Sequence, residues 1–263
     1  MVLEVLICTY NEGILRVPDM ILAPRPDIKW LVAFQYSDSA YKSMLPPIEQ
    51  DRTDITIVSH AGRGLSRNRN MAVSYATGDI LLLADDDAKF DFIYFDRILE
   101  KFKATPSLDI ACFQAVTHNG YPLHSYPSFS FSYENMPKGY WVNSQEIAFR
   151  NTLTIPAFDE RFGINAPKMG CGEEEVFLWQ AYRKGLNITY FPEVIVETDA
   201  RTSRHNFFHD ISLQRAKGGV LCIMHGVFGA FLRCLKFAML NIGRHNPFSL
   251  MWHMTYGIFY VKR

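Results

Sequence analysis

The sequence predicts an α/β protein in which a mostly parallel sheet is flanked by helices and followed by a C-terminal amphipathic helical tail. Short apolar runs alternate with helical segments through most of the chain, with short connections between them. Several of these runs end in polar residues, as parallel strands do where their carboxyl ends form a ligand site. The tail has a different composition, because no acidic residue follows Asp210.

Length and charge indicate the domain organisation. With 263 residues, 48% of them hydrophobic, the chain can bury one large or two small cores. Residues 211–263 contain seven of the 27 Lys and Arg residues and none of the 27 Asp and Glu residues, so the first 210 residues carry a net charge of −7 and the tail +7. We therefore predict a domain over 1–210 and a basic helical tail over 211–263.

The cysteines and the N-terminus favour a cytoplasmic location. Five cysteines without CxxC or other zinc-ligand spacing indicate reduced thiols rather than a disulfide framework. The chain starts almost at once with an apolar, strand-like run and lacks the basic region and cleavage site of a secretory signal.

Apolar runs and capping signals define the expected elements. Helices are predicted after Ser66, which suits an N-cap, and from Glu173 to a stop near Gly185. A third helix is expected over 92–102. The expected strands cover 2–8, 30–34, 55–58, 80–84, 110–116, 145–150, 188–191 and 194–196, with Pro192 separating the last two.

Three consecutive carboxylates, Asp85, Asp86 and Asp87, follow the apolar strand 80–84. Carboxylates crowded at the open end of a buried strand repel one another, and a hard divalent cation with oxygen ligands relieves that repulsion. A solvated acidic turn is the alternative. We favour a cation site, because the chain also contains a candidate anion-binding loop and a second carboxylate cluster, described below.

A glycine- and arginine-rich loop over residues 60–70 precedes the first predicted helix. Its backbone N–H groups, the helix dipole and the guanidinium groups of Arg63, Arg67 and Arg69 suit an anion. A basic, solvated helix start is the alternative. Residues 80–85 resemble the second nucleotide motif of P-loop enzymes, but no GxxxxGK[ST] precedes them, which excludes that class.

Two further segments carry candidate chemistry. Residues 118–140 form a long irregular segment with six aromatic side chains from Tyr121 to Tyr140, typical either of a lid or binding loop that stacks on sugar rings or of ordinary loop packing. The second segment is a helix that begins with Glu173, Glu174 and Glu175. Acidic residues are common in the first turn of a helix, because the helix dipole stabilises negative charge there. A second carboxylate cluster also suits a general base.

The tail places apolar side chains at helical spacing over 220–242, with His225, Arg233 and Lys236 on the opposite face. Crossing a bilayer would cost about 2.5–3.5 kcal/mol for each of the two cations, whereas nine apolar residues return only about 0.3–0.6 kcal/mol apiece. The net free energy of crossing a bilayer is therefore close to zero or unfavourable. We favour a helix lying in the membrane surface over a helix packed on the domain core.

The ordered motifs resemble those of glycosyltransferase family 2, which has the GT-A fold. The resemblance covers about residues 2–200. Its motifs are CTYNE at 8–12, GLSRNRN at 64–70, GDILLLADDDAKF at 78–90, FDERFG at 158–163 and GCGEEE at 170–175.

The resemblance implies roles for these residues around a nucleotide-diphosphate sugar. Mn²⁺ or Mg²⁺ would be held by Asp85 and Asp87, the ends of a DxD motif, with Asp87 the expected direct ligand. Glu174 would be the general base for the acceptor hydroxyl, and Glu173 would assist acceptor binding. The donor would lie near Thr9, Asn11, Glu12, Arg69, Asp85 and Asp86. Residues 1–117 would then be the donor half and 118–210 the acceptor half.

Departures from the family pattern leave three points open. The second strand ends in Gln35 to Asp38 instead of Asp-Asp-Gly-Ser, so the nucleobase of the donor is not defined. Either Glu174 or Glu175 can be the catalytic base. A metal-binding histidine often follows the last strand in the family. The third metal ligand is open here, because that place holds Glu197 and Thr198, with His205 and His209 further on. The QxxRW signature of processive synthases is absent.

The leading hypothesis is an inverting, metal-dependent glycosyltransferase at the inner face of the cell membrane. We expect a glycan or lipid-linked acceptor, membrane-surface contact through residues 218–263, a part in cell-surface polysaccharide synthesis, and no nucleic-acid partner. One alternative is a nucleotidyltransferase that makes a sugar nucleotide and releases pyrophosphate. The other is a non-catalytic protein that binds glycans or membranes.

Overall fold

The computed structural model describes residues 1–49, 52–199 and 206–262. Its contacts divide the chain into two compact units. The first contains residues 1–63, 68–157 and 180–200, and the second contains 64–67, 158–179 and 201–263. The boundary predicted at residue 210 and the division at residue 117 stay predictions.

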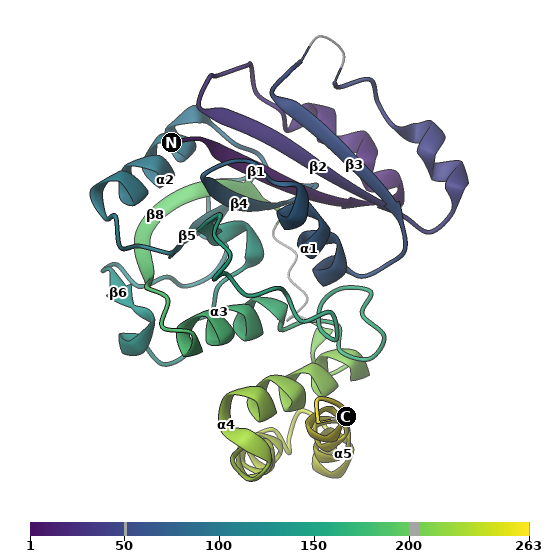
Figure 1. Ribbon diagram of the computed structural model, residues 1–263. Coiled ribbons are helices and arrows are strands. Elements are labelled where there is room, and N and C mark those ends of the chain that lie inside the picture. The colour runs from purple at the N-terminus through teal and green to yellow at the C-terminus, as the bar shows by residue number, and fades with distance from the viewer. Residues whose placement is uncertain (50–51, 200–205, 263) are drawn as a thin grey trace. The chain divides into compact units, whose positions relative to one another are not determined.

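The first unit is built on an eight-stranded sheet with the order β3-β2-β1-β4-β7-β5-β8-β6. Figure 1 shows β1, β2 and β3 side by side in this sheet. Strands β1 to β4 run parallel to one another, β7 is antiparallel to both β4 and β5, and β5 and β8 are parallel. The strands are β1 Leu3–Tyr10, β2 Ile28–Tyr36, β3 Ile55–Ala61, β4 Ile80–Asp85, β5 Ile110–Thr117, β6 Phe131–Ser132, β7 Ile147–Arg150 and β8 Ile188–Thr198. A mostly parallel sheet with flanking helices confirms the predicted class.

Helices and 3₁₀ turns lie between these strands, and α4 and α5 follow the last strand. The α-helices are α1 Leu65–Tyr75, α2 Phe92–Ala104, α3 Glu173–Arg183, α4 Ile211–Leu240 and α5 Pro247–Tyr260. The 3₁₀ turns are η1 Asn11–Asp19, η2 Ser39–Met44, η3 Tyr133–Asn135 and η4 Ser144–Glu146. Helix α2 is capped by the Asp91 side chain and turns Phe95, Ile98 and Phe102 into the core, where Trp30 packs edge-on against Phe95.

Two local predictions are wrong. Helix α1 begins at Leu65, so Ser66 lies inside it, and the Ser66 hydroxyl donates to the Phe162 carbonyl at 2.6 Å instead of capping the helix. The strands expected on either side of Pro192 are one strand, β8. The pairing of β5 with β8 passes from Cys112↔Tyr190 to Gln114↔Val194, so Pro192 falls in an irregularity where no ladder N–H is required.

The second unit contains the hairpin of α4 and α5. Small buried residues of α4, Cys222, Ala230, Cys234 and Ala238, pack against Leu250, Met254 and Ile258 of α5. The start of α4 packs elsewhere, since Ala216 and Val220 share a core with Phe162, Met169 and Val176.

The single apolar stripe predicted over 220–242 is wrong, because α4 is broken at Gly226, whose φ of 71° is outside the helical region. Before the break, Val220 is buried. After it, Phe231 and Leu235 are exposed, whereas Ala238 of the same predicted stripe is buried. A helix interrupted at one glycine cannot keep one continuous face.

Candidate functional site

The candidate site lies where β1 and β4 end at the same edge of the sheet. Strands β2 and β3 extend the sheet from one side of β1 and β4 extends it from the other, so the strand order reverses between β1 and β4. Cys8 pairs with Asp85, which aligns the ends of the two strands. Ligands of open α/β sheets bind at such a switch point, because the loops after the two strands lead away from each other.

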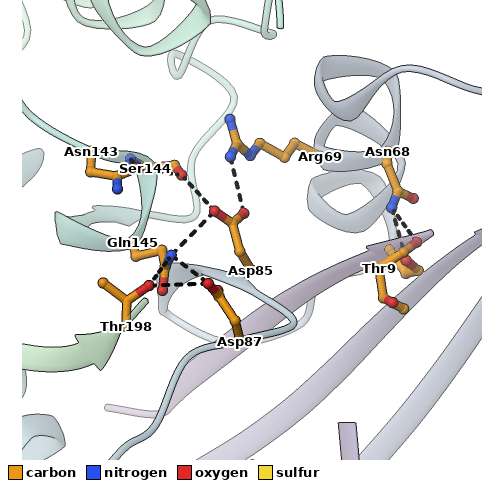
Figure 2. A network of polar contacts seen from close by, with 10 residues as sticks. Thr9, Asn68, Arg69, Asp85, Asp87, Asn143, Ser144, Gln145 and Thr198 are labelled. Carbon is orange, nitrogen blue, oxygen red and sulfur yellow. Dashed lines mark hydrogen bonds and ion pairs between the residues drawn. The ribbon is translucent and has the colours of Figure 1, made fainter. Parts of the chain in front are cut away.

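The three aspartates do not point the same way. Asp85 and Asp87 turn toward Gln145, whose amide nitrogen lies 3.3 Å from Asp85 Oδ2 and 3.4 Å from Asp87 Oδ1 (Figure 2). Asp86 turns toward β1, where its carboxylate accepts from the Thr9 hydroxyl at 2.7 Å and pairs with Arg16. The triplet is therefore a pair plus one residue with a different role.

Asp85 is held from two sides. The Arg69 guanidinium, only 1% exposed, lies 3.2 Å from Asp85 Oδ1. The Ser144 hydroxyl lies 3.4 Å from Asp85 Oδ2. Because Arg69 comes from α1 and Ser144 from η4, one carboxylate is fixed by two separate elements (Figure 2). Of the three arginines predicted to bind an anion, Arg63 and Arg67 are exposed.

Strand pairing explains how Gln145 reaches the carboxylates. Strand β7 is antiparallel to β4, with Ala148 opposite Leu82, so the residues just before β7 lie beyond the end of β4. Residue Thr198 arrives by a different route. An antiparallel bridge joins Lys89 to Glu197 at the end of β8, and Thr198 Oγ1 lies 3.4 Å from Asp87 Oδ2 and 3.0 Å from the Gln145 amide nitrogen.

The loop after β1 is fixed by side-chain amides. The Asn68 amide donates to the carbonyls of Thr9 at 3.2 Å and Ala33 at 2.9 Å, which ties α1 to the ends of β1 and β2. Asn11 has φ 49° and accepts from the Ser37 backbone N–H at 2.9 Å. Thr9 near the end of β1, Asn11 at the start of η1 and Asp85 at the end of β4 therefore lie at the same edge of the sheet, while Glu12 is exposed on η1.

Burial shapes the electrostatics of the pair. Burial, and then the charges of Asp85, Asp199 and Asp86, raise the pKa of the Asp87 carboxyl above its usual value. A nearby positive charge stabilises the ionised form of a carboxylate in such a position. Arg69 supplies one at Asp85.

The η4 turn that presents Ser144 and Gln145 rests on a fully buried carboxylate, Glu146. The Tyr126 hydroxyl donates to Glu146 Oε1 at 2.6 Å, and the Asn143 N–H donates to Glu146 Oε2 at 3.1 Å in a capping box. The His124 ring stacks on Trp141 and is tilted relative to Tyr126, with its centroid 3.9 Å from each of the two ring centroids. Burial raises the pKa of Glu146, while the nearby His124 ring, 3.6 Å from Glu146 Oε1, and the hydrogen bond from Tyr126 oppose that rise.

The aromatic segment 118–140 is divided between packing and exposure. Phe131 stacks on Tyr190 with centroids 4.7 Å apart and meets Tyr140 edge-on. Tyr121 and Phe129 are exposed. Ordinary packing therefore accounts for part of the segment, and only its exposed rings are available to a ligand.

The predicted base belongs to the second unit. Glu173, at the first position of α3, is 3% exposed, and Glu174 and Glu175 are partly buried. Their roles as acceptor ligand and general base stay predictions. His209 is also in the second unit, and His205 lies outside the described residues.

Oxygen-rich side chains at the site fit a hard divalent cation. Within residues 1–49, 52–199 and 206–262, no group of three or more His, Cys, Asp and Glu residues is arranged to hold a metal ion. The two carboxylates of Asp85 and Asp87 converge instead on an amide and a hydroxyl, from Gln145 and Thr198. Carboxylate, amide and hydroxyl oxygens are the ligands that Mg²⁺ and Mn²⁺ prefer.

Sequence reasoning missed Gln145, Ser144 and Thr198 as members of this site. The available signal was the position of Ser144 and Gln145 directly before an apolar strand, in a sheet whose strand ends were already predicted to bind. Thr198 was considered only as the residue in place of a family histidine.

The chain belongs to glycosyltransferase family 2, because the family described as "Glycosyl transferase family 2" matches residues 4–161. It is therefore a glycosyltransferase, which decides against a nucleotidyltransferase. No curated protein matches the sequence.

Solved structures support the GT-A fold. S. aureus TarS 1–349 is 14% identical with a TM-score of 0.59, over 98% of this chain and 81% of that chain. The same fragment with UDP-GlcNAc is 16% identical with a TM-score of 0.53, over 95% and 76%. Its complex with UDP is 16% identical with a TM-score of 0.54, over 95% and 75%.

Proposed function

We propose that this glycosyltransferase moves a sugar from a nucleotide-diphosphate sugar to a hydroxyl of a glycan or lipid-linked acceptor, with inversion and with Mn²⁺ or Mg²⁺. The observation that carries the proposal is the convergence of Asp85 and Asp87 at the switch point of the sheet. The complexes of S. aureus TarS with UDP-GlcNAc and UDP support a uridine nucleotide as the first donor to test.

The proposed mechanism divides the work between donor and acceptor residues. When bound, the cation neutralises charge that develops on the departing diphosphate. Asp85 and Asp87 would hold it, and Arg69 keeps Asp85 in place. Thr9, Asn11 and Glu12 would line the donor site. Glu174, or Glu175 in its place, would take the proton from the acceptor hydroxyl.

The first experiment removes one member of each half. We expect Glu174→Gln to lower sugar transfer by about 100-fold or more, the range found when a general base is removed. We expect Asp87→Ala, which removes a cation ligand, to lower it by at least about 10-fold. Glu175→Gln distinguishes the two candidate bases. Glu100→Gln, at an exposed position of α2, is the matched control. Transfer is measured as UDP released from UDP-sugars, with folding checked by thermal unfolding.

Other outcomes separate the alternatives. Full transfer by folded Asp87→Ala and Glu174→Gln proteins would contradict the mechanism. Intact glycan or vesicle binding without donor hydrolysis or transfer would support a non-catalytic protein. Pyrophosphate in place of UDP would indicate nucleotidyl transfer, against the family assignment.

We also infer that the α4–α5 hairpin holds the enzyme on an anionic membrane surface, at the cytoplasmic face, for cell-surface polysaccharide synthesis. Helix α4 is long and apolar enough to cross a membrane by length and composition. The break at Gly226 and the packing of its first half support surface contact instead. Large apolar side chains are exposed along the hairpin at Phe228, Phe231, Leu232, Leu235, Met239, Leu240, Phe248, Trp252 and Phe259.

The charges of the hairpin support the same partner. Arg233, Lys236 and Arg244 are exposed among these apolar residues, and no acidic residue follows Asp210. Apolar area and positive charge together are what interfacial helices use to bind anionic lipid, with about 1 kcal/mol from each basic residue near the surface.

A further inference from the structure

We propose that Gln145 and Thr198 complete the cation site that Asp85 and Asp87 begin, with the amide oxygen of Gln145 turned toward the bound cation. The inference rests on the cation dependence of the proposed function. It adds the amide of Gln145 from η4, and it assigns the hydroxyl of Thr198 to the place where the family resemblance predicts a histidine.

The first observation is the convergence of three oxygen-bearing side chains on one amide group. The Gln145 nitrogen lies 3.3 Å from Asp85 Oδ2, 3.4 Å from Asp87 Oδ1 and 3.0 Å from Thr198 Oγ1 (Figure 2). An amide nitrogen carries two hydrogens and so cannot satisfy three acceptors fully. The point occupied by this nitrogen is therefore one toward which oxygens from β4, the following turn and β8 are directed.

The second observation is a buried acceptor without a donor. Gln145 is 2% exposed, and within the described part of the chain its Oε1 atom has no hydrogen-bond partner. Buried amide oxygens are nearly always paired, because leaving one unpaired forfeits its hydration without replacement. This orientation of the amide is therefore favourable only at its nitrogen end.

A half-turn about the last side-chain bond exchanges the two ends of the amide. The Gln145 oxygen would then face Asp85, Asp87 and Thr198, which is repulsive on its own and favourable around a divalent cation. The amide thus has one orientation for each state of the site. Without a cation its nitrogen bridges the carboxylates, and with a cation its oxygen becomes a ligand.

The two roles make opposite predictions for Gln145→Leu. A leucine has a similar size but neither amide atom. If the oxygen is a ligand, the variant binds Mn²⁺ about 10-fold or more weakly, the range seen when groups that support a metal site are removed. If the amide only bridges the carboxylates, it competes with the cation, and the variant binds Mn²⁺ as tightly as the unchanged protein or more tightly.

The measurement is a titration of the full chain with Mn²⁺, with and without saturating UDP, in which the free ion is followed by its electron paramagnetic resonance signal. Gln145→Glu keeps an oxygen at this place and adds charge, so it should bind Mn²⁺ at least as tightly as the unchanged protein. Gln114→Leu is the matched control, because the Gln114 amide bonds the Tyr190 hydroxyl instead of a carboxylate.

Thermal unfolding in EDTA checks the fold of each variant. If Gln145→Leu does not fold, the Mn²⁺ affinity of Gln145→Glu tests the inference. Equal or tighter Mn²⁺ binding by Gln145→Leu, or weaker binding by Gln145→Glu, would overturn the inference and leave the proposed function intact. Absence of Mn²⁺ binding by the unchanged protein would overturn both the inference and the cation dependence, whereas UDP release in EDTA would still report on transfer.

Discussion

Asp86 lies between two predicted metal ligands, but its contacts are with β1 and η1. Its carboxylate accepts from the Thr9 hydroxyl and pairs with Arg16 of η1. Gly13 leaves room for this carboxylate, because a Cβ at Gly13 would collide with Asp86 Oδ2. These contacts support a positioning role, in which Asp86 holds the loop after β1 against the end of β4.

We predict that Asp86→Ala lowers the free energy of unfolding by about 1–3 kcal/mol, the cost of leaving a hydrogen-bonded group unpaired, with most of it from the Thr9 contact because Arg16 is exposed. Its Mn²⁺ affinity should fall much less than that of Asp87→Ala. Urea unfolding and Mn²⁺ titration measure the two effects. A variant with unchanged stability and the Mn²⁺ loss of Asp87→Ala would contradict the assignment.

The carboxylate triplet was predictable as a site, and the direction of each carboxylate was not. Alternation along a strand no longer applies from the end of β4 at Asp85 onward, so contacts with residues far away in the sequence decide where Asp85, Asp86 and Asp87 point. The residue type of Gln145 gave no signal beyond its position before a strand, because glutamine is common on surfaces and becomes important here only through its burial among carboxylates.

At the scale of elements, η4 is the part of the site that sequence patterns describe least. A strand was expected from Gln145, but residues 144–146 form a 3₁₀ turn, and β7 begins at Ile147. The turn exists because buried Glu146 accepts from both Asn143 and Tyr126. Tyr126 belongs to the irregular segment, so part of that segment serves to support the site.

We predict that Tyr126→Phe lowers the free energy of unfolding by about 1–3 kcal/mol, because it leaves the buried Glu146 carboxylate with one donor fewer. Mn²⁺ affinity should fall with it, since η4 presents Gln145. Tyr121→Phe is the control, because the Tyr121 side chain is exposed. If Tyr126→Phe destabilises the protein without any change in Mn²⁺ affinity, η4 does not depend on this bond for its position.

For the whole molecule, the fold class, the family and a helical tail could be predicted from the sequence. The strand runs and motif order carry those predictions, and both are local. The packing within the tail could not be predicted, because the break at Gly226 and the close packing of α4 on α5 depend on contacts along the whole hairpin. This packing also changes how membrane binding should be tested.

Deleting residues 218–263 would remove Val220 and Val261, which pack with Phe162, Met169 and Val176. The deletion would therefore damage the second unit and could abolish vesicle binding for that reason alone. Exposed residues are the better target. Phe248 and Trp252 are 85% and 72% exposed on α5, so changing both to serine should have little effect on folding.

We predict that the Phe248→Ser/Trp252→Ser protein loses at least about 10-fold in affinity for anionic vesicles, because burying each ring in the interface is worth about 1.5–3 kcal/mol. Co-sedimentation with phosphatidylcholine vesicles containing phosphatidylserine measures this. Ile93→Ser, at an exposed position of α2, is the matched control. Arg233→Gln/Lys236→Gln should weaken binding mainly at low salt, since screening already reduces the contribution of these charges at high salt. Unchanged co-sedimentation by the serine double variant would place membrane contact, if any, outside the hairpin.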